Sequence, residues 1–291
     1  MGTYFEKSRF RGVKFSGSNF TLTVFAHSTW ENCVYRDCLF EKANLGGMEI
    51  TDCEFHDCSF PQTIFSETTF RNCRFERCKF NHIMIESPQL TECSIIDSEF
   101  AGAMILDGSF RDVSIEGSSF ERLTVRGGSW RDVDIFQSSI FMSMWIELNM
   151  AKTNFRDCRL HRILFQRDCV LEQIDFSSST LRLVNASGLN LSSSVFQRTS
   201  GELCDFSESV ITNSVWIDVR LESCRFAYAV MTDSEFNAVR FIDANFQDAD
   251  LRGSRFANCN LFSADFLHSR IGDAHFSECE LGRTLLQEWS P

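Results

Sequence analysis

The chain has 291 residues, of which 43% are hydrophobic and 23% charged, and its net charge is −12. This balance allows a large buried core and excludes an intrinsically disordered chain. The negative charge argues against a protein that binds nucleic acid directly by neutralising phosphates. It permits binding to a basic protein surface, including one that normally holds DNA.

The beginning of the chain predicts a cytoplasmic protein. The opening MGTYFEKSRF lacks the charged-then-apolar order of a signal peptide. No apolar run approaches the roughly 18 residues of a membrane span, so we expect no membrane attachment. In a reducing compartment the 13 cysteines are not expected to form a disulfide scaffold.

A repeat of five residues runs along the chain from Phe5. A large apolar residue returns at every fifth position, and a small residue such as Ala, Ser, Thr or Cys stands two positions before it. Of the 30 phenylalanines, all but Phe136, Phe141 and Phe262 fall on this grid, once one inserted residue before Leu171 is allowed for. Neither the helical period nor the strand period fits this pattern. It predicts short extended segments separated by corners, coiled so that each turn stacks on the last.

In several units the small residue is followed by Asn or Asp and then by Leu or Phe, as in Ala43-Asn44-Leu45 and Ala264-Asp265-Phe266. In this pattern the sequence resembles the pentapeptide-repeat family. The resemblance implies an all-β fold, a right-handed quadrilateral parallel β-helix with four pentapeptides per coil and about 14 coils. We expect a single β-helix over residues 1–286, with a one-residue register shift between Phe165 and Leu171, and a short C-terminal tail or cap over 287–291.

Two places depart from the repeat. Ile83 and Pro88 are bulky residues at small inward positions, and Pro88 cannot donate a ladder hydrogen bond, so a local bulge or a loosened coil is expected there. At Gly201 the central residue shrinks, which predicts free space or a distortion in the core.

The cysteines are predicted to be core residues. All 13 stand two residues before a central position, so they are spread along the solenoid instead of converging on a metal. Four of them are expected to stack as one inward column: Cys33, Cys53, Cys73 and Cys93. The six histidines fall on outward positions without a serine or cysteine at a catalytic spacing. We therefore expect no enzyme and no catalytic, cofactor or metal site.

Corner positions of every fourth unit are expected to stack carboxylates into two columns. The first acidic column consists of Asp52, Glu92, Asp112 and Asp132, and the second acidic column consists of Asp37, Asp57 and Asp97. Arg71, Arg111 and Arg131 stand beside the first column. The columns are either ladders of negative charge used in binding or solvated corners with arginine–carboxylate pairs.

An apolar group interrupts the outward positions of residues 135–150. Its members are Phe136, Phe141, Met142, Met144 and Ile146. Exposed apolar clusters of this size mark contacts, so we predict a partner or homodimer site. The alternative is a locally shifted register that buries them.

The resemblance implies a function as well as a fold. Pentapeptide-repeat relatives include bacterial proteins that mimic DNA, bind type II topoisomerases and protect them from quinolones or toxins. We therefore expect a non-enzymatic protein-interaction rod, with DNA gyrase or topoisomerase IV as the specific partner. The alternative is a bacterial scaffold or secreted effector that binds a host protein, and an enzyme is the third class considered.

Overall fold

The computed structural model describes residues 3–166 and 168–285. These residues form strands, turns and bends, and no helix occurs among them. The described residues form a parallel β-solenoid of about 13 turns, which confirms the predicted fold class. The chain divides into two compact units, unit 1 over Met1–Asn149 and unit 2 over Met150–Pro291. The single domain over 1–286 stays a prediction, and the predicted tail over 287–291 lies outside the described residues.

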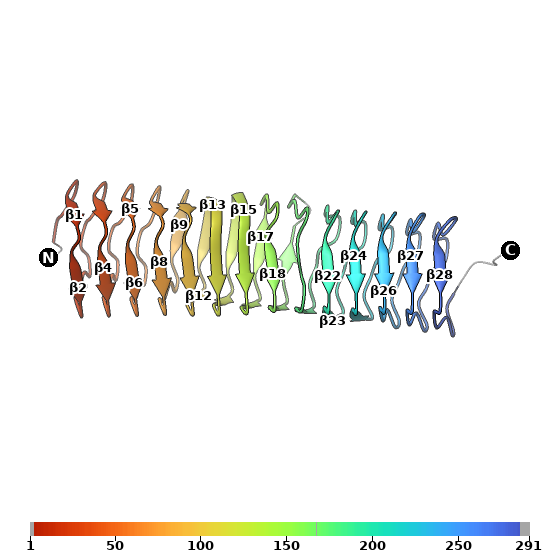
Figure 1. The fold of residues 1–291 in the computed structure, drawn as a ribbon. Coiled ribbons are helices and arrows are strands. Elements are labelled where there is room, and N and C mark those ends of the chain that lie inside the picture. The colour runs from red at the N-terminus through yellow and green to blue at the C-terminus, as the bar shows by residue number, and fades with distance from the viewer. Residues whose placement is uncertain (1–2, 167, 286–291) are drawn as a thin grey trace. The chain divides into compact units, whose positions relative to one another are not determined.

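Each coil of unit 1 has four short extended segments, and corresponding segments of successive coils pair in parallel to form four faces (Figure 1). The first face has Phe10, Trp30 and Ile50 in register at its centre. Its strands are β1 (Arg9–Arg11), β3 (Thr29–Glu31), β5 (Glu49–Thr51), β7 (Thr69–Arg71) and β10 (Gln89–Thr91). The second face contains β2 (Lys14–Ser16), β4 (Val34–Arg36), β6 (Glu54–His56), β8 (Arg74–Glu76) and β11 (Ser94–Ile96).

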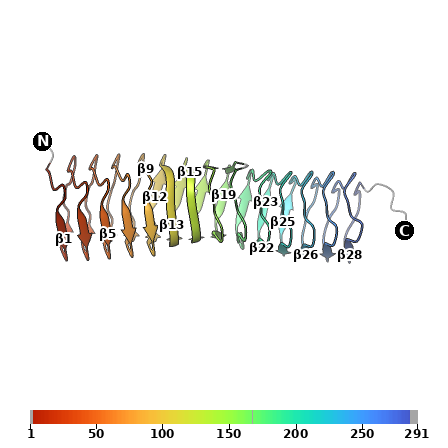
Figure 2. The same cartoon turned by 90° about the horizontal axis from the view of Figure 1, so that it is seen from above.

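The third and fourth faces complete each coil of unit 1. The third face contains β12 (Glu99–Ala101), β14 (Ser119–Glu121) and β16 (Ser139–Phe141), and the fourth contains β9 (Met84–Glu86) and β17 (Met144–Ile146). Two longer strands, β13 (Met104–Glu116) and β15 (Thr124–Phe136), continue around the corners from the fourth face to the second. They pair along nearly their whole length, and Figure 2 shows them next to each other from above.

Unit 2 repeats the same plan. One series of strands comprises β18 (Asn154–Arg156), β22 (Val195–Gln197), β24 (Val215–Ile217), β26 (Glu235–Asn237), β27 (Arg255–Ala257) and β28 (His275–Ser277). Another comprises β19 (Arg159–His161), β21 (Thr180–Arg182), β23 (Ser200–Glu202) and β25 (Arg220–Glu222), and β20 (Leu164–Phe165) lies on a further side. The pairs across the predicted insertion are 21 residues apart, as in Leu160 with Leu181, whereas later pairs such as Phe196 with Trp216 are 20 apart. The predicted register shift is therefore confirmed.

Hydrogen bonds at the corners explain why Asn or Asp precedes the central residue in many repeats. The side-chain oxygen of Asn44 accepts a hydrogen bond from the Gly46 N–H at 2.9 Å, and Asp265 does the same for Leu267. This local bond stabilises the turn that follows the central residue. The second residue after nearly every described central position adopts a left-handed backbone, for example Asp52 with φ 54°. Asp and Asn tolerate that conformation better than most side chains.

Inside the coils, central residues stack on their equivalents one turn away. Phe55 and Phe75 lie with ring centroids 4.8 Å apart, and Phe60 and Phe80 lie 5.0 Å apart, each pair nearly parallel. Offset stacking of this kind contributes about 0.5–1.5 kcal/mol per pair beyond the burial of area. The interior of each unit is therefore a continuous apolar column.

The coils near Pro88 are looser than their neighbours but keep their register. Leu90 pairs with Phe70 on one side and Phe110 on the other, so no bulge forms. Instead an apolar cavity of about 40 Å³ lies in the interior. It is lined by Phe65, Phe70, Phe75, Phe80, Ile85, Pro88, Leu90, Ile95, Phe100, Ile105, Phe110, Ile115, Phe120 and Trp130. Of the two predicted outcomes, the loosened coil is the one observed.

The predicted space at Gly201 is absent. Gly201 stays in register between Leu181 and Leu221. A side chain there would lie 2.2 Å from the Leu181 carbonyl oxygen and 3.0 Å from a Leu221 methyl carbon. The backbone of the preceding coil therefore approaches Gly201 closely, so of the two predicted outcomes free space is not observed and a local distortion is the one that fits.

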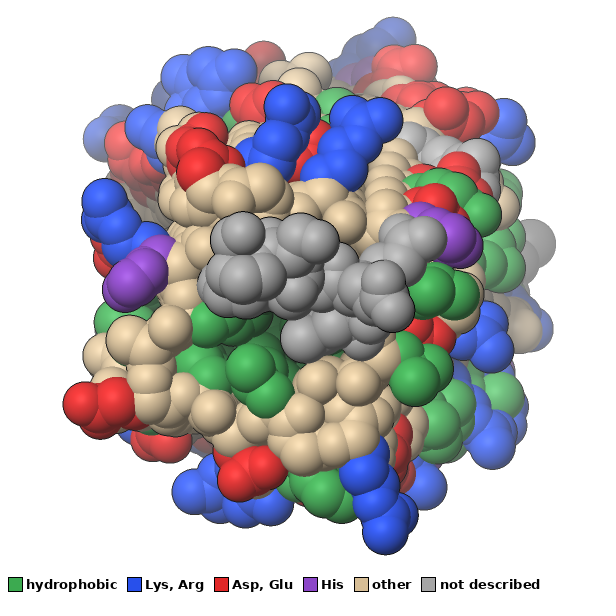
Figure 3. All heavy atoms as spheres, turned by 90° about the vertical axis from the view of Figure 1, so that its right-hand side faces the viewer, with side chains coloured by type: hydrophobic (Ala, Val, Ile, Leu, Met, Phe, Trp, Pro, Cys, Tyr) green, Lys and Arg blue, Asp and Glu red, His purple; other side chains and the backbone are tan. Residues whose placement is uncertain are grey.

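The last described coil of unit 2 is less buried than the coils before it. Ile271 and Phe276 occupy central positions but are only half-buried, and Leu285 is exposed. Figure 3 views this end and shows hydrophobic side chains reaching the surface beside atoms that are not described. In the described ranges no helix is long and apolar enough to cross a membrane.

Candidate interaction surfaces

The fourth face of unit 1 carries a column of exposed apolar side chains. Ile64, Met84 and Met104 follow one another on adjacent coils, and Met144 continues the series after Thr124. Their exposed fractions are 46%, 58%, 39% and 37%, respectively, so more than a third of each side chain faces outward. We call these four residues the methionine column. The strands that carry Met84, Met104 and Met144, β9, β13 and β17, are labelled in Figure 1.

The structure brings together four of the five residues predicted as an apolar patch. Met144 and Ile146 lie on the fourth face, and Phe141 and Met142 form the corner that leads into it. Phe136 lies one corner earlier, between the second and third faces, so it is not part of this group.

The alternative of a shifted register is wrong. Phe136 pairs with Glu116 and Phe141 with Glu121, each 20 residues earlier, as everywhere else in unit 1. Met142 remains 42% exposed. Met142 and Met144 therefore reach the surface in the regular register, and Phe136, Phe141 and Ile146 are half-buried. The role of the patch in binding stays a prediction.

Ile64, Met84 and Met104 were missed by the sequence analysis, which considered only a continuous run of apolar residues. The signal that could have found them is their spacing of 20 residues at one outward position, the residue before the central one. The predicted patch is thus the last coil of a longer apolar face.

The first acidic column stacks as predicted. The backbone N–H of Asp52 donates to the Arg71 carbonyl on the next coil at 3.0 Å, and that of Glu92 donates to Arg111 at 3.1 Å. Residues flanking Asp112 and Asp132 pair directly with one another. All four acidic side chains are exposed.

Neutral and cationic side chains lie beside the first acidic column, but the ion pairs of the described part of unit 1 do not include its carboxylates. Asn72 donates its side-chain N–H to Asp52 at 2.6 Å. Arg111 and Arg131 stack on each other one position earlier. Within the described part of unit 1 the ion pairs fall on other positions. The first column therefore keeps exposed carboxylates beside arginines.

The second acidic column is neutralised at its centre. Arg77 stands between Asp57 and Asp97 and donates to both oxygens of Asp57, at 2.7 and 2.9 Å. These hydrogen bonds hold the pKa of the Asp57 carboxyl below its usual range. Arg77 also donates a hydrogen bond to Glu76. Here the arginine–carboxylate interpretation is the one observed, whereas Asp37 and Asp97 keep exposed corner positions.

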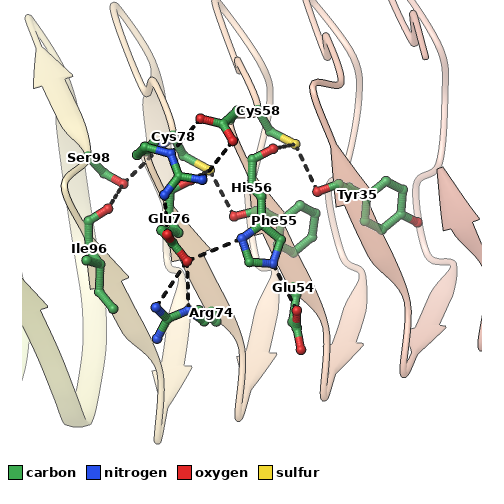
Figure 4. A network of polar contacts seen from close by, with 12 residues as sticks. Tyr35, Glu54, Phe55, His56, Cys58, Arg74, Glu76, Cys78, Ile96 and Ser98 are labelled. Carbon is green, nitrogen blue, oxygen red and sulfur yellow. Dashed lines mark hydrogen bonds and ion pairs between the residues drawn. The ribbon is translucent and has the colours of Figure 1, made fainter. Parts of the chain in front are cut away.

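The same network extends onto the second face. Arg74 donates to Glu76 at 3.0 and 3.1 Å, and Arg74 and Arg77 together lower the pKa of Glu76. His56 lies between Glu54 and Glu76, with nitrogen–oxygen distances of 2.9 and 3.3 Å (Figure 4). The cluster is a surface ion-pair network, whose members contribute little individually to stability.

The cysteines occupy the inward positions predicted for them. Twelve of the 13 are buried and Cys279 is half-buried, and all are free thiols. The Cys33 N–H contacts the Cys53 sulfur at 3.4 Å, which confirms the predicted column. Burial raises the pKa of the Cys53 and Cys259 thiols to about 12. Within residues 3–166 and 168–285, no three His, Cys, Asp or Glu side chains gather as a metal site would require.

A sequence model of the pentapeptide repeat region matches residues 48–130 and 219–290, which is more than half of the chain. The chain belongs to the pentapeptide repeat family. No curated protein matches its sequence.

Several solved structures are similar in fold. One is HetL, a pentapeptide repeat protein involved in heterocyst differentiation regulation from the cyanobacterium Nostoc sp. strain PCC 7120, with 15% identity over 73% of this chain and 88% of HetL and a TM-score of 0.28. Another is QnrB1, a plasmid-mediated fluoroquinolone resistance protein, with 14% identity, coverage of 85% and 92%, and a TM-score of 0.33. A third is the A-module of the mannuronan C-5 epimerase AlgE6 from Azotobacter vinelandii, with 8% identity, coverage of 99% and 91%, and a TM-score of 0.28. Likenesses this weak carry no argument about function.

Proposed function

We propose that this protein is a non-enzymatic module that binds another protein through its outward columns. The observation that carries this proposal is the regular stacking of exposed side chains, because residues 20 apart in sequence present one chemistry repeatedly on one side. In the described coils the interior is built from apolar residues, and a small apolar cavity lies near Pro88. Pentapeptide repeat proteins are mostly non-enzymatic, although some solenoid structures are enzymes.

The specific partner we propose is a type II topoisomerase, DNA gyrase or topoisomerase IV, bound at the first acidic column. The exposed carboxylates of Glu92, Asp112 and Asp132 recur on neighbouring coils, which in parallel sheets lie about 4.8 Å apart. Asp52 lies two coils from Glu92, beyond Asn72. A basic groove that normally neutralises phosphates can accept such a row. This proposal places the activity in the cytoplasm, and its biological outcome would be protection from a quinolone or a toxin.

The test is a supercoiling and drug-induced cleavage assay with purified gyrase and topoisomerase IV. The wild-type protein is expected to change activity or drug sensitivity of at least one enzyme. A variant carrying Asp52→Asn, Glu92→Gln, Asp112→Asn and Asp132→Asn is expected to lose the effect. A matched control carries Asp37→Asn and Asp97→Asn in the second acidic column and is expected to retain it. If the wild type leaves both enzymes unchanged, the topoisomerase proposal is wrong.

The methionine column favours a second candidate function, a scaffold or secreted effector that binds a different protein. An exposed apolar face of this kind is unrelated to phosphate mimicry and fits a protein contact. Detection of the protein in the culture medium of the producing bacterium would favour the effector. Its confinement to the cytoplasm would favour the topoisomerase partner.

A further inference from the structure

The methionine column is bordered on one side by an acidic row. Glu67 and Asp107 lie at the corner that follows the fourth face, and Glu86 lies on the face itself next to that corner. All three are exposed. The Glu67 N–H donates to the Glu86 carbonyl at 2.7 Å, so these residues belong to adjacent coils. The three residues therefore lie along the edge of the face that carries Met84 and Met104.

The other border of the face differs in charge. Its corner residues on the same coils are Gln62, His82 and Gly102, followed by Arg122. Arg122 already pairs with Glu121 at 3.5 Å. The face therefore combines an apolar centre, one acidic edge and one nearly neutral edge.

We propose that this face of unit 1 binds a basic amphipathic helix of a protein partner. The apolar side of the helix would cover Ile64, Met84 and Met104, and its Lys or Arg side chains would lie against Glu67, Glu86 and Asp107. Methionine is a flexible, polarisable side chain that suits such surfaces. The inference rests on the general proposal of a protein-binding module, but it uses a different surface from the topoisomerase proposal.

The spacing of the face matches a helix. Neighbouring coils are about 4.8 Å apart, and one helical turn rises 5.4 Å. A helix that lies along the stack therefore places residues i, i+4 and i+7 near three successive coils. An extended peptide would present side chains at a spacing of about 6.6–6.8 Å on one side, which fits the coils less well.

The charges around this face argue against two other occupants, a second copy of this chain and an anionic membrane. A second copy of this chain would bring another acidic row, and the opposite edge of the face offers few cations to meet it: Gln62 and Gly102 are uncharged, and Arg122 already pairs with Glu121. An anionic membrane would be repelled by Glu67, Glu86 and Asp107. A cationic helix supplies both the apolar contact and the counter-charges.

The experiment uses the full chain and three synthetic peptides of about 16 residues, in the range where a helix is marginally stable alone. The first peptide has Leu at i, i+3, i+4 and i+7 repeats with Lys along one border. The second carries Glu in place of Lys, and the third keeps the basic composition but contains two central prolines. Binding is measured by fluorescence anisotropy at several salt concentrations. The first peptide is expected to bind at least tenfold more tightly than either of the others.

Two variants and one control locate the site. Met84→Ser with Met104→Ser is expected to weaken binding of the basic helix at least tenfold, and it changes only exposed side chains. Glu67→Gln, Glu86→Gln and Asp107→Asn together are expected to weaken it about fivefold and to reduce its salt dependence. The control Asp52→Asn, Glu92→Gln and Asp112→Asn removes three charges from the first acidic column and is expected to leave the affinity unchanged.

Three results would overturn the proposal. The first is failure of the wild type to bind the basic helix, and the second is unchanged affinity after Met84→Ser with Met104→Ser. The third is a loss of affinity in the first-column control equal to that in the acidic-row variant, which would indicate non-specific attraction to an acidic protein. A homodimer seen by light scattering and dissociated by the methionine variant would show that a second copy occupies the face. The methionine variant is expected to act like wild type on gyrase, so the two proposals can fail separately.

Discussion

Two neighbouring stretches of unit 1 share one backbone register but differ in how their interiors are filled. In the coils that hold Tyr35 and Phe55, rings stack 5.0 Å apart and lie outside the cavity near Pro88. Two coils beyond Phe55, the same position holds Ile95 and then Ile115, which remain in register but line the apolar cavity of about 40 Å³. The ladder hydrogen bonds therefore determine the register of the coils, whereas the central side chains determine how tightly their interior is packed.

The largest test of this comparison truncates one residue in each stretch. Phe55→Ala is expected to lower the free energy of unfolding by about 3–5 kcal/mol, because it opens a void between the stacked rings of Tyr35 and Phe75. Ile95→Ala is expected to cost less, about 2 kcal/mol, because fewer atoms are removed and its surroundings are already loose. Urea unfolding of both variants measures the difference. A greater loss for Ile95→Ala would mean that the cavity is not a region of weak packing.

Filling the cavity is expected to raise the free energy of unfolding instead of lowering it. Ile95→Phe is expected to raise the free energy of unfolding by about 1 kcal/mol, the amount that a void of this size costs. The matched control is Ile140→Phe, at a buried central position that does not line the cavity. Overpacking there is expected to destabilise by about 1–3 kcal/mol. If both changes destabilise equally, the coils near Pro88 are as full as the others.

The filled coils contain two buried polar atoms without a hydrogen-bond partner in the described structure, the Trp30 indole nitrogen and the Tyr35 hydroxyl. Tyr35 is 1% exposed and stacks on Phe55 at 5.0 Å, and its hydroxyl has no hydrogen-bond partner in the described structure. Burial raises the pKa of the Tyr35 phenol. Tyr35→Phe is therefore expected to stabilise the protein by about 0.5–1 kcal/mol, since a buried unsatisfied group is removed. A lower thermal midpoint for the variant would instead reveal a partner for the hydroxyl.

The smallest expected effect is on the outer corners of the same two stretches. Arg77 lowers the pKa of Asp57 in the folded chain. The ionised carboxylate is thus favoured by folding, and its contribution is present above the ordinary carboxyl pKa and lost as the pH falls through the lowered value. Arg77→Gln is expected to return the pKa of Asp57 toward its usual range, as followed by carboxyl-carbon NMR. Because both groups are exposed, acid unfolding should shift little, and an unchanged Asp57 titration would contradict the pairing.

The sequence predicted most of the fold because one period decides it. The positions of Phe55 and Cys53 follow from counting in fives, and the stacking of Asp52 below Asn72 follows from counting in twenties. The repeat period alone could not predict how neighbouring side chains and backbone adjust to an irregular residue. Whether Gly201 leaves a gap depends on how far Leu221 moves in, and whether Arg77 neutralises Asp57 depends on side-chain rotamers.

The candidate surfaces were predicted less completely for a related reason. A contiguous stretch such as residues 141–146 is visible in the sequence, whereas Ile64, Met84 and Met104 become neighbours only after coiling. The four residues of the patch that lie on the fourth face or at the corner leading into it could be predicted, but Phe136 could not be assigned correctly without knowing which corner it occupies.

The uniform spacing of the ladder partners has a kinetic consequence. Pairs lie 20 or 21 residues apart throughout the described coils, so in a chain of 291 residues the relative contact order is about 0.07, a value typical of helical bundles and not of β-sandwiches. Every new coil closes the same short loop on a template that already exists, so folding should nucleate on a few adjacent coils and propagate along the chain. Although it is all-β, this protein should fold with the speed of a locally connected one.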